Sequence, residues 1–91
     1  MKPLKIGELV LIEWVDSSQP IPNWQHTESI GHDLITCESV GWVLYYEGNK
    51  VVVIAPNRGD FETDNEQYSG CTSIPGGCIK RIFRLQTGEE E

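Results

Sequence analysis

Two runs of strand-forming residues, separated by a tight turn, constrain the fold of this chain more than any other feature. Residues 40–46 read Val-Gly-Trp-Val-Leu-Tyr-Tyr, and residues 51–55 read Val-Val-Val-Ile-Ala. Between them lies Glu-Gly-Asn-Lys, whose Gly and Asn are typical turn residues. β-Branched and aromatic residues favour pleated strands, so two such runs on either side of a short turn predict an antiparallel hairpin.

The rest of the sequence predicts a longer first strand for this hairpin and three further strands. Residues 8–15 are apolar on both alternating faces, which indicates a strand covered on both sides or one in a small closed barrel. The first hairpin strand is expected over 33–46, with Gly41 at a bulge or bend. Short strands are expected at 71–74 and 79–85, with a one-turn break at 75–77. The intervening segments are expected to be an irregular loop with a short helical turn (20–33) and a polar, acidic loop (56–70).

Five strands in a chain of 91 residues predict a single small domain, 1–87, followed by a solvated acidic tail, 88–91. Five short strands offer too little surface for a two-sheet sandwich. Closing the sheet into a barrel removes its exposed edges and encloses one core. The sequence therefore predicts an all-β, five-stranded small barrel.

Residues 39–85 resemble the SH3-like barrel, and more narrowly its Sm-like version. The resemblance rests on the Gly-bent strand with its hairpin partner, and on Thr-Ser-Ile-Pro-Gly-Gly-Cys-Ile-Lys-Arg-Ile at 72–82. It implies a five-stranded SH3-like (Sm-like) small barrel with a 3₁₀ turn before the last strand. The chain departs from that family because it begins with a strand in place of a helix. It also lacks the base-stacking and uridine-binding motifs, so the RNA function of Sm-like proteins does not carry over.

A second resemblance spans most of the chain. Glu-x-x-Asp-Ser at 13–17, Trp24, Ser-Val-Gly-Trp at 39–42 and Ile-Pro-x-x-x-Ile at 74–79 are similar to uncharacterised small bacteriophage and prophage proteins. This resemblance implies a phage-type accessory protein that acts in the cytoplasm of a bacterial host. It indicates the biological context of the protein but predicts no reaction and no ligand.

Charge and composition exclude several classes of function. The chain has 7 basic and 14 acidic residues and a net charge of −7, too few cations for a long DNA or RNA partner. No apolar run is long enough to span a membrane, and residues 1–7 do not resemble a secretion signal. We therefore expect a cytoplasmic protein with three free thiols. The spacings of its Cys and His residues do not match a zinc site, so no metal or other cofactor is predicted.

No catalytic constellation is present in the sequence, which favours a protein that is not an enzyme. Ser17 and Ser18 have no His at a recognised nucleophile spacing. The alternating acidic residues of 60–66 lack the central Gly and terminal Glu of a calcium loop. The basic cluster at 80–84 has two interpretations: a patch that holds one or two phosphates, or ordinary exposed residues of an edge strand.

The aromatic residues also allow two interpretations. Trp14 and Trp42 fill the barrel in the first. In the second, Trp24 stands on an exposed loop beside basic residues, where it stacks on a base while a guanidinium binds the phosphate. The candidate ligand-binding residues are Trp24, Arg58, Tyr68, Lys80 and Arg84.

These observations lead to a functional hypothesis and an alternative. The hypothesis is a non-enzymatic, homo-oligomeric accessory protein that binds a small anionic, nucleotide-like ligand. One concrete version is sequestration of a nucleotide signal used in antiphage immunity. The alternative is an acidic protein-interaction module that uses residues 60–66 to inhibit a host bacterial protein or to mimic nucleic acid. An assembly adaptor in the virion also remains open.

Overall fold

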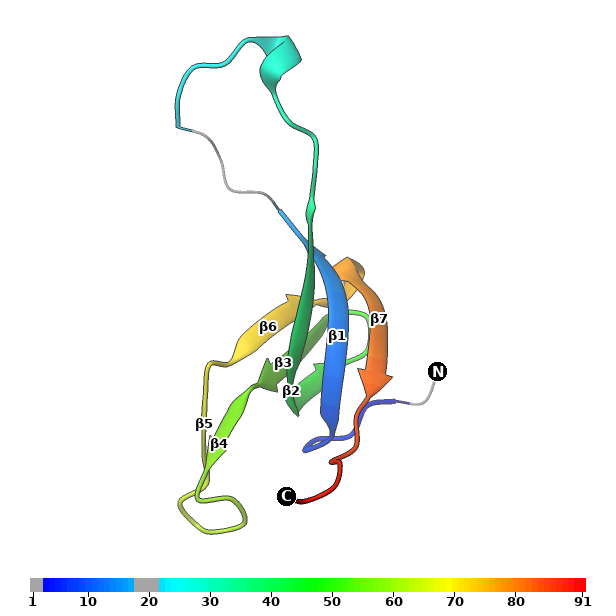
Figure 1. Cartoon of the computed structure of the whole chain (residues 1–91), viewed down its shortest axis with the longest axis vertical. Helices are drawn as coiled ribbons and strands as arrows, with labels where there is room; N and C mark the ends of the chain where they lie inside the picture. The colour runs from blue at the N-terminus through cyan, green and yellow to red at the C-terminus, as the bar shows by residue number, and fades with distance from the viewer. Residues whose placement is uncertain (1–2, 18–21) are drawn as a thin grey trace.

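Strands make up most of the regular structure in the computed structural model, which describes residues 3–17 and 22–91 (Figure 1). Five strands form one antiparallel sheet in the order β6-β3-β2-β1-β7. They are β1 (Leu9–Asp16), β2 (Ile35–Glu47), β3 (Val51–Ala55), β6 (Thr72–Pro75) and β7 (Ile79–Arg84). The all-β class and the β2–β3 hairpin are therefore confirmed, and every predicted strand end falls within two residues of an observed one.

The segment predicted as a polar loop at 56–70 contains a small hairpin instead. β4 (Asn57–Gly59) and β5 (Gln67–Ser69) pair antiparallel in a separate two-stranded sheet. Each strand has only three residues. Such a length is too short to leave a detectable alternation in a polar segment, which is why the sequence pattern does not reveal it.

Two short 3₁₀ helices complete the described elements. η1 (Thr27–Ser29) lies in the 22–34 segment, where a helical turn was expected, and η2 (Gly76–Cys78) directly precedes β7. The predicted turn before the last strand is thus confirmed. In the described part of the chain no helix is long and apolar enough to cross a membrane.

The predicted closure of the sheet into a barrel is not found. The edge strands β6 and β7 do not pair with each other in the described residues, although both flank the same core. All of β6 pairs with β3, and the Gly76 N–H then donates to the carbonyl of Lys50 at 2.9 Å. This bond ties η2 to the β2–β3 turn, so the chain leaves the sheet there and β7 begins beside β1.

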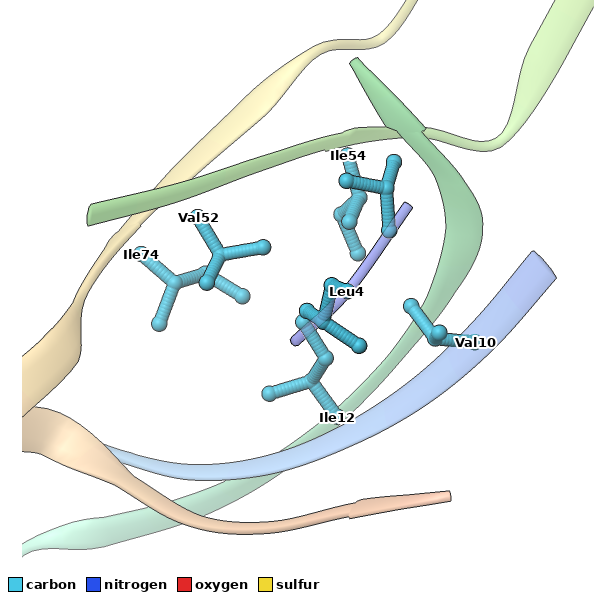
Figure 2. Packing of buried hydrophobic residues seen from close by; sticks show 7 residues of the cluster. Leu4, Val10, Ile12, Val52, Ile54 and Ile74 are labelled. Carbon is cyan, nitrogen blue, oxygen red and sulfur yellow. The ribbon is translucent and has the colours of Figure 1, made fainter. Parts of the chain in front are cut away.

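The core is aliphatic and lies inside the curve of the sheet (Figure 2). Its buried side chains are Leu4, Val10, Ile12, Val43, Val52, Ile54 and Ile74. Trp14 packs against this cluster from a half-buried position, and its indole N–H donates to the Ser39 hydroxyl at 3.0 Å. Trp42 does not belong to the core, because it alternates with the buried Gly41 and Val43 and so faces outward.

Gly41 marks a close approach between β2 and the end of β3. A Cβ at this position would lie 2.7 Å from the carbonyl oxygen of Ala55, closer than real Cβ contacts. The β2–β3 register shifts nearby, between Val43 and Tyr45. The bulge expected at Gly41 therefore lies further along β2. Gly41 has no side chain, which allows β2 to lie this close to the backbone of Ala55 at the end of β3.

Candidate functional site

Arg58, the middle residue of β4, lies over two aromatic rings. Its guanidinium carbon is 4.2 Å from the centroid of the Trp42 ring and 3.4 Å from that of Phe61. Trp42 belongs to β2 and Phe61 to the tip of the small hairpin, so this contact joins the hairpin to the main sheet. Stacking of this kind uses the flat faces of the guanidinium and leaves the N–H groups at its edge for other partners.

An open hollow of about 350 Å³ lies along the same hairpin. It is lined by Asn57, Arg58, Gly59, Gln67, Tyr68 and Ser69. This lining holds a cation, two amides and two hydroxyl groups, with no carboxylate among them. The Tyr68 hydroxyl already donates to Glu66. The Arg58 guanidinium, the two side-chain amides and the Ser69 hydroxyl are donors as well, so the chemistry of the hollow suits a group rich in acceptor oxygens, such as a phosphate or carboxylate.

Arg58 differs from most cations of the described chain in having no acidic partner there. Lys50, Lys80, Arg81 and Arg84 each form an ion pair with a glutamate. No carboxylate oxygen of residues 3–17 and 22–91 forms such a pair with Arg58. Within the described residues, the guanidinium contacts the Trp42 and Phe61 rings and forms no ion pair.

Tyr68 lies directly across the ladder from Arg58. Its hydroxyl donates a hydrogen bond to Glu66 Oε1. That bond raises the pKa of Tyr68 above its ordinary value, with further contributions from burial and from the Glu66 charge. Tyr68 is consequently a protonated phenol at neutral pH, and its hydroxyl is already engaged at the rim of the hollow.

The tip of the hairpin is closed by its own hydrogen bonds. The Asn65 side-chain amide donates to Asp60 Oδ2 at 2.6 Å, and the Thr63 hydroxyl donates to the Asp60 carbonyl at 2.6 Å. Asp60 and Glu62 both adopt the left-handed backbone conformation, with φ of 49° and 64°. The acidic segment 60–66 therefore forms an ordered turn, and this turn holds the Phe61 ring against the Arg58 guanidinium.

The basic cluster on β7 is paired with acidic residues of the neighbouring strand. Arg81 Nη2 lies 2.8 Å from Glu13 Oε2, and Lys80 Nζ lies 3.7 Å from Glu13 Oε1. Arg84 pairs through Nε with Glu8. These contacts agree with the interpretation of the cluster as ordinary residues of an edge strand.

These ion pairs shift the titration of both glutamates. The Arg81 hydrogen bond, aided by the charges of Arg81 and Lys80, lowers the pKa of Glu13. A hydrogen bond from the Lys5 backbone N–H, followed by the contact with Arg84, lowers the pKa of Glu8. A carboxyl group with a lowered pKa in the folded chain stabilises the fold above its ordinary pKa and loses this contribution as the pH falls.

We therefore expect the melting temperature to fall as the pH drops through the ordinary glutamate pKa of about 4.3. Glu13→Gln removes one titrating group and should reduce this acid-induced fall. Glu28→Gln is the matched control, because Glu28 forms no ion pair in the described residues. The measurement is thermal unfolding by circular dichroism across the acid range. Equal acid sensitivity in Glu13→Gln and the wild type would contradict the assigned role of Glu13.

Trp24 is fully exposed and lies in the 22–34 segment, which we call the arm. The arm projects beyond the sheet, and the β4–β5 hairpin lies toward the opposite end of the 55 Å long axis (Figure 1). Trp24 lines a separate hollow with its own neighbours in the arm. The exposed position of Trp24 agrees with the second interpretation of the aromatic residues, but one chain does not bring it to Arg58.

Of the five predicted ligand-binding residues, the structure brings together Arg58 and Tyr68 only. Lys80 borders a hollow of about 190 Å³ beside the β2–β3 turn. Arg84 borders another hollow near Pro3 and Leu4. Trp42 and Phe61 were not predicted as partners of Arg58. Side chains alternate between the two faces of a strand, so assigning Val43 to the core predicts that Trp42 faces outward. An outward-facing Trp42 is available for contact with Arg58.

The part of the chain that the structure describes contains no group of three His, Cys, Asp or Glu side chains placed to hold a metal ion. Cys37, Cys71 and Cys78 are free thiols. Compared with known proteins, the chain matches no protein-family model, no curated protein and no solved structure.

Proposed function

We propose that this protein is a non-enzymatic binding protein that recognises a small anionic, nucleotide-like ligand at the β4–β5 hairpin. The observation that carries the proposal is Arg58, stacked on Trp42 and Phe61 and without a carboxylate partner in the described residues. The proposed anchor is the edge of its guanidinium, which pairs with a phosphate or carboxylate through two parallel hydrogen bonds.

The surroundings of Arg58 support this role. Stacking on two rings restricts the guanidinium, so less side-chain entropy is lost when a ligand binds. Asn57, Gln67 and Ser69 add hydrogen-bond donors around the same hollow. Phe61 keeps 44% of its surface exposed, which leaves an aromatic surface for a nucleobase.

We also propose that the main sheet is an SH3-like fold left open between its edge strands. The strand order β6-β3-β2-β1-β7, with η2 between the last two strands, supports this assignment. In such an arrangement the β4–β5 hairpin is an insertion that carries the binding residues. An accessory protein of a phage in the host cytoplasm, where nucleotide signals are available, is a setting compatible with this function.

The proposal predicts that Arg58→Lys weakens ligand binding at least about tenfold, because lysine keeps the charge and loses the planar fork. The measurement is isothermal titration calorimetry with inorganic phosphate, a nucleoside monophosphate and a cyclic dinucleotide as probes. Arg81→Lys is the matched control, since the guanidinium of Arg81 is engaged by Glu13. Unchanged affinity in Arg58→Lys would contradict the proposed anchor.

The same experiment separates this function from the acidic protein-interaction module. The exposed carboxylates of the tip, such as Glu62 and Asp64, favour a basic partner protein. A complex made through them weakens steeply with salt and is insensitive to Arg58→Lys. If none of the three probes binds to the wild-type protein, the proposal of a small anionic ligand is wrong and this module takes its place.

A further inference from the structure

The hairpin that carries Arg58 is strongly acidic. Residues 57–69 contain one basic residue, Arg58, and four acidic residues, which all lie in the turn between β4 and β5. These four are Asp60, Glu62, Asp64 and Glu66. Within residues 3–17 and 22–91, none of the four forms an ion pair with a cation. A ligand that binds to Arg58 therefore approaches a region with more negative than positive charge.

The contacts of Arg58 connect its guanidinium to three of these acidic residues. Both chain neighbours of Phe61 are acidic, and the Phe61 ring centroid lies 3.4 Å from the guanidinium carbon of Arg58. Glu66 accepts the hydrogen bond of Tyr68, which is the register partner of Arg58. This hydrogen bond, burial and the Glu66 charge raise the pKa of Tyr68, whereas the Arg58 charge lowers it. The Tyr68 phenol thus lies within reach of both charges.

Among the described residues that line the hollow, Arg58 is the only charged one, and the other polar side chains are neutral amides and hydroxyl groups. A guanidinium binds a phosphodiester or a carboxylate through two parallel hydrogen bonds, and each of these groups has two oxygens that share one negative charge. One cation then balances one anion. A phosphate monoester brings nearly two negative charges at neutral pH, and a polyphosphate brings more. This further charge meets no cation in the lining and is repelled by the nearby carboxylates.

We infer that the hollow at Arg58 selects singly charged oxyanions, a phosphodiester or a carboxylate attached to a nucleoside, over phosphate monoesters and polyphosphates. The inference rests on the proposed function, because it names the charge class of the ligand at that same site. A second ligand charge loses its hydration and is repelled, whereas the single guanidinium is already paired with the first. Glu66 is therefore a specificity-determining residue, since its charge discriminates against the second negative charge of a ligand.

The first test compares four adenosine derivatives, which keep the nucleobase constant. Cyclic AMP and adenosine 5′-carboxylate each carry one negative charge, whereas AMP and ATP carry more. The measurement is isothermal titration calorimetry of the full chain at about pH 7.5, at low ionic strength and without divalent cations. Both singly charged compounds should bind at least about fivefold tighter than AMP, and ATP should bind most weakly. AMP or ATP binding as tightly as either singly charged compound would overturn the inference alone. If none of the four binds, the proposed function is wrong and the inference falls with it.

The second test removes the charge of Glu66 and keeps its hydrogen bond. In Glu66→Gln the side-chain oxygen still accepts from the Tyr68 hydroxyl. Repulsion scales with the charge of the ligand, so this variant should strengthen AMP binding by about two- to threefold and cyclic AMP binding by a smaller factor. Glu28→Gln, in η1 of the arm, is the matched control and should leave both affinities unchanged. Circular dichroism confirms that both variants are folded. An equal effect of Glu66→Gln on the two ligands would overturn the role of Glu66, whereas Arg58→Lys tests the proposed anchor separately.

Discussion

Replacing Gly76 with alanine is expected to destabilise the fold by about 3 kcal/mol, the scale of severe overpacking. A Cβ on Gly76 would lie 2.0 Å from the carbonyl oxygen of Asn49 and 2.3 Å from its carbonyl carbon. Both atoms belong to the backbone of the β2–β3 turn, so a side-chain rotation cannot relieve the overlap. The hydrogen bond from the Gly76 N–H to Lys50 would be strained as well.

Gly77→Ala is the matched control for Gly76→Ala. Gly77 belongs to the same 3₁₀ helix, and a Cβ there would meet no atom within 4 Å. Thermal unfolding should show a melting temperature roughly 15 °C lower for Gly76→Ala and within a few degrees of wild type for Gly77→Ala. Equal melting temperatures for the two variants would mean that η2 does not press against the β2–β3 turn.

Ile12→Ala is expected to lower the free energy of unfolding by about 3–4 kcal/mol. Ile12 is completely buried in β1, the strand that pairs with both β2 and β7. Truncation of its side chain leaves a cavity in the aliphatic cluster. The measurement is urea unfolding followed by tryptophan fluorescence.

Ile35→Ala provides the same chemical change at an exposed position. Ile35 lies at the start of β2 with 46% of its surface exposed, so we expect a loss below about 1 kcal/mol. A loss in Ile12→Ala no larger than that in Ile35→Ala would contradict the burial of Ile12 in the core.

The strands of the main sheet were predictable because their signals are local. Alternation in residues 8–15 and the β-branched run of 51–55 determine both the element type and its length. The pairing of β2 with β3 follows from the short turn between them. The open edge between β6 and β7 was not predictable, since it depends on the hydrogen bond from Gly76 to Lys50, a contact between distant parts of the chain.

The candidate site was only partly predictable for a similar reason. Arg58 and Tyr68 come together because β4 and β5 pair, and these strands are too short to show a period. The stack on Trp42 depends on a register pairing, because Trp42 is paired with Ala55, the last residue of β3, and β4 begins two residues later. The hypothesis placed Trp24 on an exposed loop near the basic residues, whereas the arm that carries it projects away from the sheet (Figure 1).

The pairing of β1 with β7 has a consequence for how the chain reaches its fold. The Glu13–Arg81 contact spans 68 positions of sequence, so the first and last strands of the sheet meet only through a long loop closure. During synthesis, β1 and the β2–β3 hairpin emerge well before β7, and one edge of β1 stays unpaired until then. Contacts of such large sequence separation slow folding, because the entropy of closing the loop is lost before the contact forms. Completion of the core is therefore a late, cooperative event that waits for the last strand.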